Sequence, residues 1–290
     1  MTSVVSDGER LAAPAKLNLC LQITGRRADG YHLLDSVVVF TAFGDSLVVR
    51  PADTANDADR ITITGPFAAA IADEPENICL RAIRKYRDSG GAIGPVSVTL
   101  DKHIPVGAGL GGGSSNAAAI LRYLDRHATT RLGPAALSAL ALDLGADVPV
   151  CLAGTAQHMT GIGEQRRQLD PAPHGHIVLA RPDTSLSTVT VFRTFADGQG
   201  ERPPARELPP PPAHPREIMR RGNDLADAAR HLCPDIGDLM ERMARCDGAE
   251  AVRMSGSGSA CFALFPDAAL AAAGARRLTA QGLWAIATVF

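Results

Sequence analysis

Residues 105–121 read PVGAGLGGGSSNAAAIL, and glycine fills five of the seven positions from 107 to 113. Glycine lets backbone N–H groups approach an anion closely, and the first N–H groups of a following helix add a partial positive charge of about half a unit. Ser114, Ser115 and Asn116 are good N-cap residues, and the two serines can add hydroxyl donors or a magnesium ligand. The stretch predicts a phosphate-binding loop that leads into a helix.

A dinucleotide-binding loop is one alternative, because Gly107, Gly109 and Gly112 match the pattern G-x-G-x-x-G. The match stands alone, since Pro105 separates it from the strand before it and no second βαβ unit surrounds it. A Walker A loop is excluded, because no Gly-Lys-Ser or Gly-Lys-Thr closes the stretch. A flexible loop or a tight packing turn without a ligand is the remaining alternative. The density of glycine and the two serines favour a phosphate.

The composition is that of an ordinary globular protein, with 290 residues, 46% of them hydrophobic and 21% charged. The formal net charge of −2 provides no basic excess that would attract nucleic acid or an anionic membrane. The N-terminal sixteen residues lack the pattern of a secretory signal. No two cysteines form a CxxC pair, which argues against a zinc site and a disulfide framework and favours a reducing, cytoplasmic environment.

The order of expected elements indicates an α+β fold. Residues 16–23 alternate with period two, which predicts a half-buried strand with Lys16 and Asn18 on the polar face. An Asp-Gly turn signal follows this strand. The proline-rich segment 201–215 is expected to be an extended surface loop. Further strands are expected at 33–40, 46–50, 61–64, 95–100 and 284–289, with two more around a Gly-Ser-Gly turn in 251–265, and helices at 76–91, 117–127, 134–144, 224–231, 235–246 and 267–281.

Three segments of the chain together resemble the three motifs of the GHMP kinase superfamily of small-molecule kinases. They are APAKLNLCLQITGRRADGYH, PVGAGLGGGSSNAAA and MSGSGSACFALF. Within the superfamily, PAKLNL followed by RADGYH and LGADVPV is similar to the members that act on a cytidine-diphosphate-linked methylerythritol. The resemblance extends from Pro14 to about Phe265.

The resemblance implies an ATP-dependent kinase with Mg²⁺ that phosphorylates the 2-hydroxyl of this substrate, in the non-mevalonate route to isoprenoids. It implies an N-terminal domain (1–160) like the second domain of ribosomal protein S5, and a C-terminal α/β-sandwich domain (161–290). Substrates would lie in the cleft between the two. Another GHMP kinase of the homoserine or mevalonate type, and a nucleotide-binding protein without turnover, are the alternatives.

The resemblance also implies the catalytic residues. Asp147 matches the catalytic aspartate, although a turn or helix-capping aspartate is the alternative. Lys16 matches the catalytic lysine, which would keep Asp147 ionised and stabilise charge during transfer. A solvated lysine at a strand start is the alternative. Asn18 is expected to orient the substrate hydroxyl, unless it is a polar residue on an exposed sheet face.

Three further side chains match positions that hold the cytosine. Tyr31 is expected to stack on the base, His32 to hydrogen-bond to it, and Phe192 to lie on its other side. An exposed loop tyrosine, a solvated histidine and a core phenylalanine on a helix are the alternatives. Residues Gly256, Ser257 and Gly258 are expected to close on phosphates or on the substrate diphosphate, with a plain hairpin turn as the alternative.

The ATP site would consist mainly of the glycine-rich stretch. Asn77 and Lys102 match positions near the adenosine, with a helix N-cap and a loop lysine as alternatives. No protein ligand of Mg²⁺ is assigned, and His174 and His176 are expected to lie in a solvated loop. The loop residues assigned to ATP are Pro105, Val106, Gly107, Ala108, Gly109, Leu110, Gly111, Gly112, Gly113, Ser114 and Ser115.

Overall fold

The computed structural model describes residues 8–54, 58–72, 74, 76–198 and 208–290. The chain forms two compact units. The first unit contains the chain up to Ala15, Gly44–Val106 and Gly111–Gly154. The second contains Lys16–Phe43, Gly107–Leu110 and Thr155–Phe290. Each of the three sequence motifs contributes residues to the second unit.

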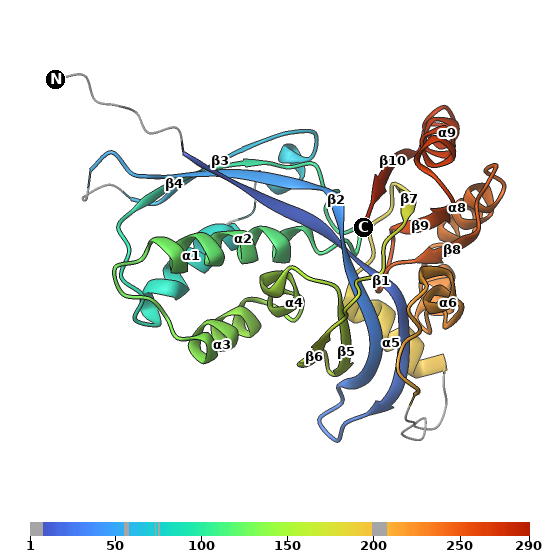
Figure 1. The fold of residues 1–290 in the computed structure, drawn as a ribbon, viewed down its shortest axis with the longest axis horizontal. Coiled ribbons are helices and arrows are strands. Elements are labelled where there is room, and N and C mark those ends of the chain that lie inside the picture. The colour runs from blue at the N-terminus through green and yellow to red at the C-terminus, as the bar shows by residue number, and fades with distance from the viewer. Residues whose placement is uncertain (1–7, 55–57, 73, 75, 199–207) are drawn as a thin grey trace. The chain divides into compact units, whose positions relative to one another are not determined.

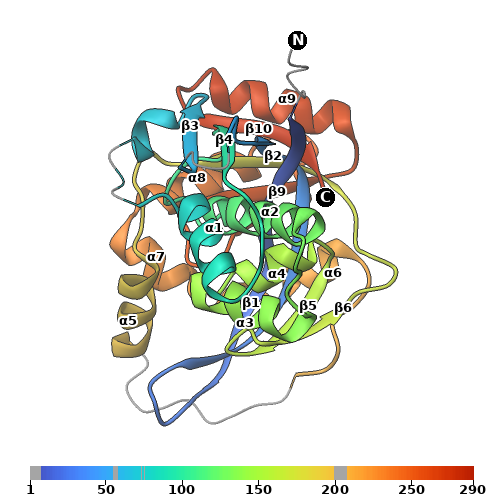
Figure 2. The same ribbon diagram turned by 90° about the vertical axis from the view of Figure 1, so that its left-hand side faces the viewer.

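The first unit packs helices beside strand segments, among them the N-terminal part of β1 (Glu9–Arg26). The C-terminal part of β2 (His32–Pro51) pairs antiparallel with β4 (Val96–Asp101), and β3 (Arg60–Thr64) pairs parallel with β4. The helices contact one another, as Figures 1 and 2 show. They are α1 (Ile78–Asp88), α2 (Gly112–His127), α3 (Pro134–Leu144) and α4 (Val148–Ala153), with a short 3₁₀ helix η1 (Ala68–Ile71) before α1.

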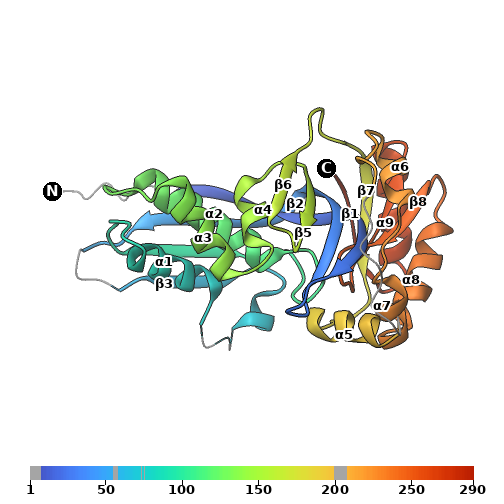
Figure 3. The same ribbon diagram turned by 90° about the horizontal axis from the view of Figure 1, so that it is seen from below.

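Two groups of strands belong to the second unit. The N-terminal part of β2 pairs with β1 (Glu9–Arg26) and antiparallel with β5 (Gln157–Gly161), and β5 pairs with β6 (Gln165–Gln168) (Figure 3). A separate antiparallel sheet has the order β10-β7-β9-β8. Its strands are β7 (His176–Arg181), β8 (Ala251–Met254), β9 (Cys261–Phe265) and β10 (Trp284–Val289).

Helices α8 (Asp235–Ala244) and α9 (Ala268–Thr279) cover one face of the four-stranded sheet (Figure 1). Their apolar side chains share a core with alternate residues of β7 and β9, as the pleat requires. The three remaining helices of this unit are α5 (Thr188–Gly198), α6 (Pro215–Arg220) and α7 (Ala226–Leu232). The α+β fold class is therefore confirmed.

The turn between β1 and β2 is where the Asp-Gly signal predicts it. Arg27 N donates to Tyr31 O at 2.7 Å, and Gly30 N donates to Arg27 O at 3.1 Å. Gly30 has φ +95°, which residues other than glycine rarely adopt. This hairpin places Tyr31 and His32 directly after the tip.

The expected bounds of two strands and of the proline-rich loop are wrong. The strands expected at 33–40 and 46–50 are parts of one strand, β2, because Gly44 continues it at a close approach to Ala13. A Cβ on Gly44 would lie 2.4 Å from Ala13 O. The proline-rich segment expected to be a loop to residue 215 ends earlier, since Pro215 begins α6, a position that proline favours. Residues 201–207 of that segment lie outside the described residues.

The strand at 16–23 differs from the half-buried strand that was expected. Residues 16–21 are buried on both faces of β1. The helix after the glycines begins at Gly112 and has Gly111 as its N-cap, so Ser114, Ser115 and Asn116 lie within its first turns. Lys16, Asn18, Ser115 and Asn116 are enclosed by protein.

Candidate active site

The three sequence motifs meet at the short segment Gly107–Leu110. Leu110 O accepts a hydrogen bond of 2.9 Å from Lys16 N, and Ala108 O accepts one of 2.9 Å from Ala260 N. Gly109 has φ +75°, and a Cβ there would lie 2.4 Å from Gly258 O. Only glycine fits this position without displacing backbone. The loop is thus fixed between β1 and the segment that joins β8 to β9.

In the first unit, the N-terminus of α2 carries the rest of the glycine-rich stretch. Gly111 is a left-handed N-cap with φ 65°, and no side chain caps the helix. None of the hydrogen bonds among the described residues is donated by the N–H groups of Gly112, Gly113 or Ser114. These groups and the helix dipole fit an anion such as a phosphate of ATP.

Lys102 lies in a buried ion pair just before the loop. Its Nζ is 2.7 Å from Asp45 Oδ2 and donates to Ile104 O at 2.6 Å. Burial lowers the pKa of Lys102, and the neighbouring Asp45 carboxylate opposes that shift. A Cβ on Gly112 would lie 3.0 Å from Lys102 Nζ, so this charge lies beside the first residue of α2. The loop-lysine alternative holds for its position, since Lys102 directly follows β4 outside any helix or strand, but its side chain is buried.

Two other predicted residues lie at helix starts in the first unit. Asn77 is the N-cap of α1, and its Oδ1 accepts from Cys79 N at 2.9 Å, as the capping alternative holds. Asp147 lies in the turn between α3 and α4, next to the first residue of α4. Asp147 is the N-cap residue of α4, as its helix-capping alternative holds by position, although its side chain makes no capping hydrogen bond.

Lys16 and Asn18 are both only 4% exposed, which rules out a solvated lysine and an exposed sheet face. Lys16 Nζ donates to Asn18 Oδ1 at 3.0 Å, and Asn18 Nδ2 donates to Ser36 Oγ at 2.8 Å. Asn18 N donates to Ser255 Oγ at 3.1 Å. Ser36 and Ser255 did not stand out in the sequence. The available signals were a serine within the apolar run of β2 in the first case, and a place directly before Gly256-Ser257-Gly258 in the second.

The structure brings His32 and Phe192 together. Their ring centroids are 5.3 Å apart, and Phe195 lies edge-on to His32 at 5.8 Å. Burial, and secondarily the charge of Arg26, lower the pKa of His32, which is half-buried beside these rings. Phe192 lies on α5 and packs partly against the core of the second unit. This position agrees with the alternative of a core phenylalanine on a helix. Tyr31 is 63% exposed.

The segment from Ser255 to Ser259 is buried throughout and joins β8 to β9 in a hairpin. Ser257 Oγ lies 2.9 Å from Thr188 Oγ1. Asn223 Nδ2 donates to Met254 O and to Gly256 O, at 2.9 and 2.8 Å. Asn223 thus holds the hairpin in place, although nothing in its local sequence marked it.

The described part of the chain contains no group of three or more His, Cys, Asp or Glu that could hold a metal ion. His176 is the first residue of β7, not part of a solvated loop. No helix among the described residues has the length and apolar character to cross a membrane.

Comparison with known proteins gives the same family in sequence and in structure. Residues 77–155 match the model of the GHMP kinases N terminal domain, and residues 213–282 match that of the GHMP kinases C terminal. The chain is 43% identical over 287 residues to the 4-diphosphocytidyl-2-C-methyl-D-erythritol kinase of Paracoccus denitrificans, covering 96% of each protein. It is 42% identical over 270 residues to the kinase of the same name from Rhodospirillum rubrum, covering 92% of this chain and 88% of the relative.

A crystal structure titled 4-(cytidine 5'-diphospho)-2C-methyl-D-erythritol kinase matches with a TM-score of 0.77 and 33% identity, covering 97% of this chain and 99% of the other. The mevalonate kinase of Methanococcus jannaschii matches with a TM-score of 0.62 at 10% identity, covering 98% of each chain, which shows a shared fold alone. The chain therefore belongs to the GHMP kinases, in the family of the 4-diphosphocytidyl-2-C-methyl-D-erythritol kinases.

Proposed function

We propose that this chain transfers the γ-phosphate of ATP to the 2-hydroxyl of 4-diphosphocytidyl-2-C-methyl-D-erythritol. The products are ADP and the 2-phosphate, in the non-mevalonate route to isoprenoids. The observation that carries the proposal is the meeting of the three kinase motifs at Gly107–Leu110, with the buried Lys16 bonded to the loop. The relatives that bear this kinase name over nearly the whole chain support the choice of substrate.

ATP would bind along the glycine-rich stretch. The N–H groups of Gly112, Gly113 and Ser114 face no protein acceptor among the described residues and suit the phosphates. Asn77 and Lys102 would lie near the adenosine, and the hydroxyls of Ser114 and Ser115 are candidate oxygen donors. These two hydroxyls are also the candidate protein ligands of Mg²⁺, which would supply positive charge at the phosphates.

Asp147 would accept the proton of the attacking 2-hydroxyl. Phosphoryl transfer depends mainly on positioning and on charge stabilisation, so the base and the cation must be held in place. Lys16 would keep the Asp147 carboxylate ionised and stabilise the transferring group. The hydrogen bond from Lys16 Nζ to Asn18 Oδ1 supports a fixed ammonium position. Asn18 would orient the substrate hydroxyl.

The cytidine end of the substrate would bind in the second unit. Tyr31 would stack on the cytosine, His32 would hydrogen-bond to it, and Phe192 would lie on its other side. The contact between the rings of His32 and Phe192 supports this arrangement. The backbone of Gly256, Ser257 and Gly258 would bind the substrate diphosphate.

The domain boundaries stay part of the proposal, with an N-terminal domain of residues 1–160, a C-terminal domain of residues 161–290, and the substrates between them. A cytoplasmic location is also proposed. All six cysteines are buried free thiols, which supports a reducing compartment.

A coupled assay of ADP release with magnesium-ATP tests the proposed function. We expect turnover with 4-diphosphocytidyl-2-C-methyl-D-erythritol and none with homoserine or mevalonate. Turnover with only one of the other alcohols would overturn the assignment of the substrate pocket. ATP binding without any phosphorylated product would instead make the chain a nucleotide-binding protein.

A further inference from the structure

One chain of hydrogen bonds connects Lys16 to the backbone of its own strand through two other side chains. An ammonium group only donates, so the Asn18 atom 3.0 Å from Lys16 Nζ is the oxygen. Asn18 Nδ2 therefore donates to Ser36 Oγ at 2.8 Å. The Ser36 hydroxyl in turn donates to Cys20 O at 2.7 Å. Each hydrogen bond determines the direction of the next one.

The Asn18 amide has little freedom to turn. A Cβ on Gly256 would already lie 3.2 Å from Asn18 Oδ1, and the backbone of Asn18 is bonded to Ser255 Oγ. Turning the amide over would point its NH₂ group at the ammonium of Lys16, where two donors would face each other. The wholly buried Ser36 hydroxyl accepts from the amide nitrogen and so holds the amide in the orientation that the Lys16 ammonium requires.

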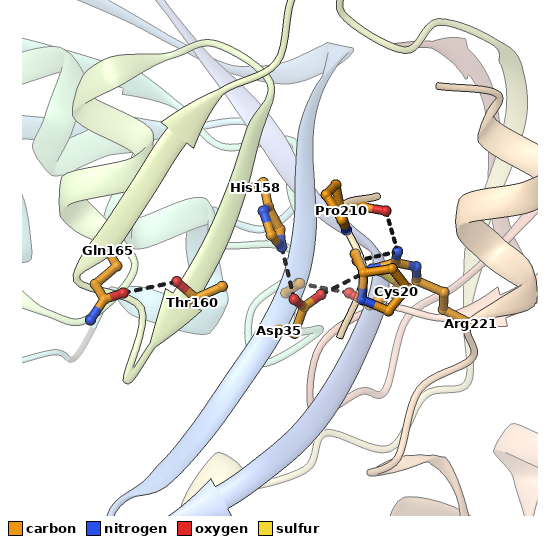
Figure 4. A network of polar contacts seen from close by, with 9 residues as sticks. Cys20, Asp35, His158, Thr160, Gln165, Pro210 and Arg221 are labelled. Atoms are coloured by element: carbon orange, nitrogen blue, oxygen red, sulfur yellow. Dashed lines mark hydrogen bonds and ion pairs between the residues drawn. The ribbon is translucent and has the colours of Figure 1, made fainter. Parts of the chain in front are cut away.

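Strand β2 is itself held firmly at this position. Asp35, next to Ser36, has its Oδ2 2.9 Å from His158 Nε2 and its Oδ1 3.3 Å from Arg221 Nη1 (Figure 4). Arg221 Nη2 also donates to Pro209 O and Pro210 O, at 2.7 and 2.6 Å. The Asp35 carboxylate is 5% exposed, so this cluster restrains β2 from inside the protein. If the Ser36 hydroxyl is lost, β2 therefore cannot easily shift to restore the position of the Asn18 amide.

We infer that Ser36 is a positioning residue for phosphoryl transfer, because its hydroxyl sets the Asn18 amide and the Asn18 oxygen holds the Lys16 ammonium. The inference rests on the proposed function, in which Lys16 stabilises the transferring group. Ser36 itself touches no substrate. Misplacing a catalytic group by about 1 Å can cost on the order of 100-fold in rate, so the Ser36 hydroxyl should affect kcat more than ATP affinity.

The test compares Ser36→Ala, Ser36→Thr and the unchanged chain with magnesium-ATP and the cytidine substrate. We expect kcat to fall by about 10- to 100-fold in Ser36→Ala, with the KM for ATP changed less than about twofold. Ser36→Thr retains a hydroxyl and should recover most of the rate. Thr41→Val is the matched control, because Thr41 is a buried residue of the same strand whose hydroxyl donates to Phe43 O. It should keep the kcat of the unchanged chain.

Two further measurements keep the outcome decisive. If Ser36→Ala does not fold, Ser36→Cys tests the same point with a group of similar size that hydrogen-bonds weakly. The NMR signal of the Asn18 side-chain amide should be protected from exchange in the unchanged chain and lose that protection in the variants without a hydroxyl. A folded Ser36→Ala with unchanged kcat and a protected Asn18 amide would overturn the inference. Inactivity of the unchanged chain would count against the proposed function alone, and the NMR measurement would still decide whether Ser36 fixes Asn18.

Discussion

Lys102 Nζ lies 2.7 Å from Asp45 Oδ2, and the two side chains are 4% and 0% exposed. The other oxygen of the carboxylate, Asp45 Oδ1, accepts from His103 N and Ile104 N, both at 2.7 Å. One buried aspartate therefore holds three consecutive residues at the entrance to the glycine-rich loop. The lysine balances the charge that this arrangement buries.

Removal of the lysine charge should leave Asp45 buried without its cation. We expect Lys102→Met to lower the free energy of unfolding by about 3–5 kcal/mol, the usual cost of breaking a buried ion pair. Urea unfolding of Lys102→Met, Asp45→Asn and the double variant measures the coupling between the two. The double variant should lose less than the sum of the single losses, because each single change already removes the pair. Strict additivity would contradict the pairing.

The buried ion pair between Arg221 and Asp35 should contribute more to the free energy of unfolding than an ion pair on the surface. Arg221→Met should cost about 3 kcal/mol or more, since Asp35 would keep only His158 as a partner in a buried site. Arg245→Met is the control, because Arg245 and Glu241 are both 68% exposed, and a surface pair contributes about 0–1 kcal/mol. Urea unfolding of both variants checks this. Equal losses in the two variants would refute the structural role of Arg221.

Asp147→Asn should reduce kcat by about 10²–10⁴-fold, the usual contribution of a general base. ATP binding, measured by calorimetry, should survive. Asp143→Asn is the control, because Asp143 is an exposed residue of the neighbouring helix α3, where it pairs with Lys85. It should keep the kcat of the unchanged chain. Full turnover of Asp147→Asn would remove Asp147 from the mechanism.

His32 should titrate below its ordinary pKa of 6.5, because burial disfavours its charged form and Arg26 adds a smaller repulsion. In an unfolded chain the imidazole would gain its proton near pH 6.5, whereas the folded chain binds it only at lower pH. The contribution of His32 to stability is therefore complete above pH 6.5 and is lost as pH falls toward its folded pKa.

NMR titration of the His32 imidazole measures this pKa directly. Phe192→Ala, which opens one side of the ring, should raise the pKa toward its ordinary value. Arg26→Gln should raise it less, since burial is the larger cause. The reverse order of the two variants would contradict the assignment of causes.

Gly109→Ala should destabilise the loop for two reasons, the backbone conformation at this position and a steric clash of the new Cβ. Its φ of +75° disfavours any other residue, and the new Cβ would lie 2.4 Å from Gly258 O. We expect a loss of about 2 kcal/mol or more in the free energy of unfolding, and weaker ATP binding. Gly94→Ala is the control, because a Cβ at Gly94 would meet no atom within 4 Å. Equal stability of the two variants would show that the loop tolerates a side chain.

Local signals in the sequence predicted the elements that local forces determine. Helix α1 has its Asn77 cap and its apolar spacing, and the hairpin at residues 27–30 has its Asp-Gly pair. Those signals indicate which residues can form a helix, strand or turn, but not which distant residues pack against it. The period of two in residues 16–23 indicated one apolar face. The residues that bury the other face include Ser255, which lies 237 residues from Asn18 in the sequence.

The candidate site followed the same rule. The family motifs indicated Lys16, Asn18, His32 and the glycine-rich stretch by type and spacing. The side chains that hold the site in place lie on other segments: Ser36 bonds to Asn18, Asp45 pairs with Lys102, and Asn223 holds the hairpin at Gly256. The serines after the glycines suggested an N-cap by propensity. The helix begins earlier because Gly111 adopts the left-handed conformation, which residues with a side chain rarely adopt.

The bond between Asn18 and Ser255 also has a consequence for biosynthesis. A ribosome makes Lys16 and Asn18 before Ser255, which follows Asn18 by 237 residues. At about 5–20 residues per second, these residues wait about 10–50 seconds for the segment that encloses them. A nascent chain that stalls before that point holds a polar lysine and asparagine in an unfinished interior. We expect chaperones to bind such an incomplete chain.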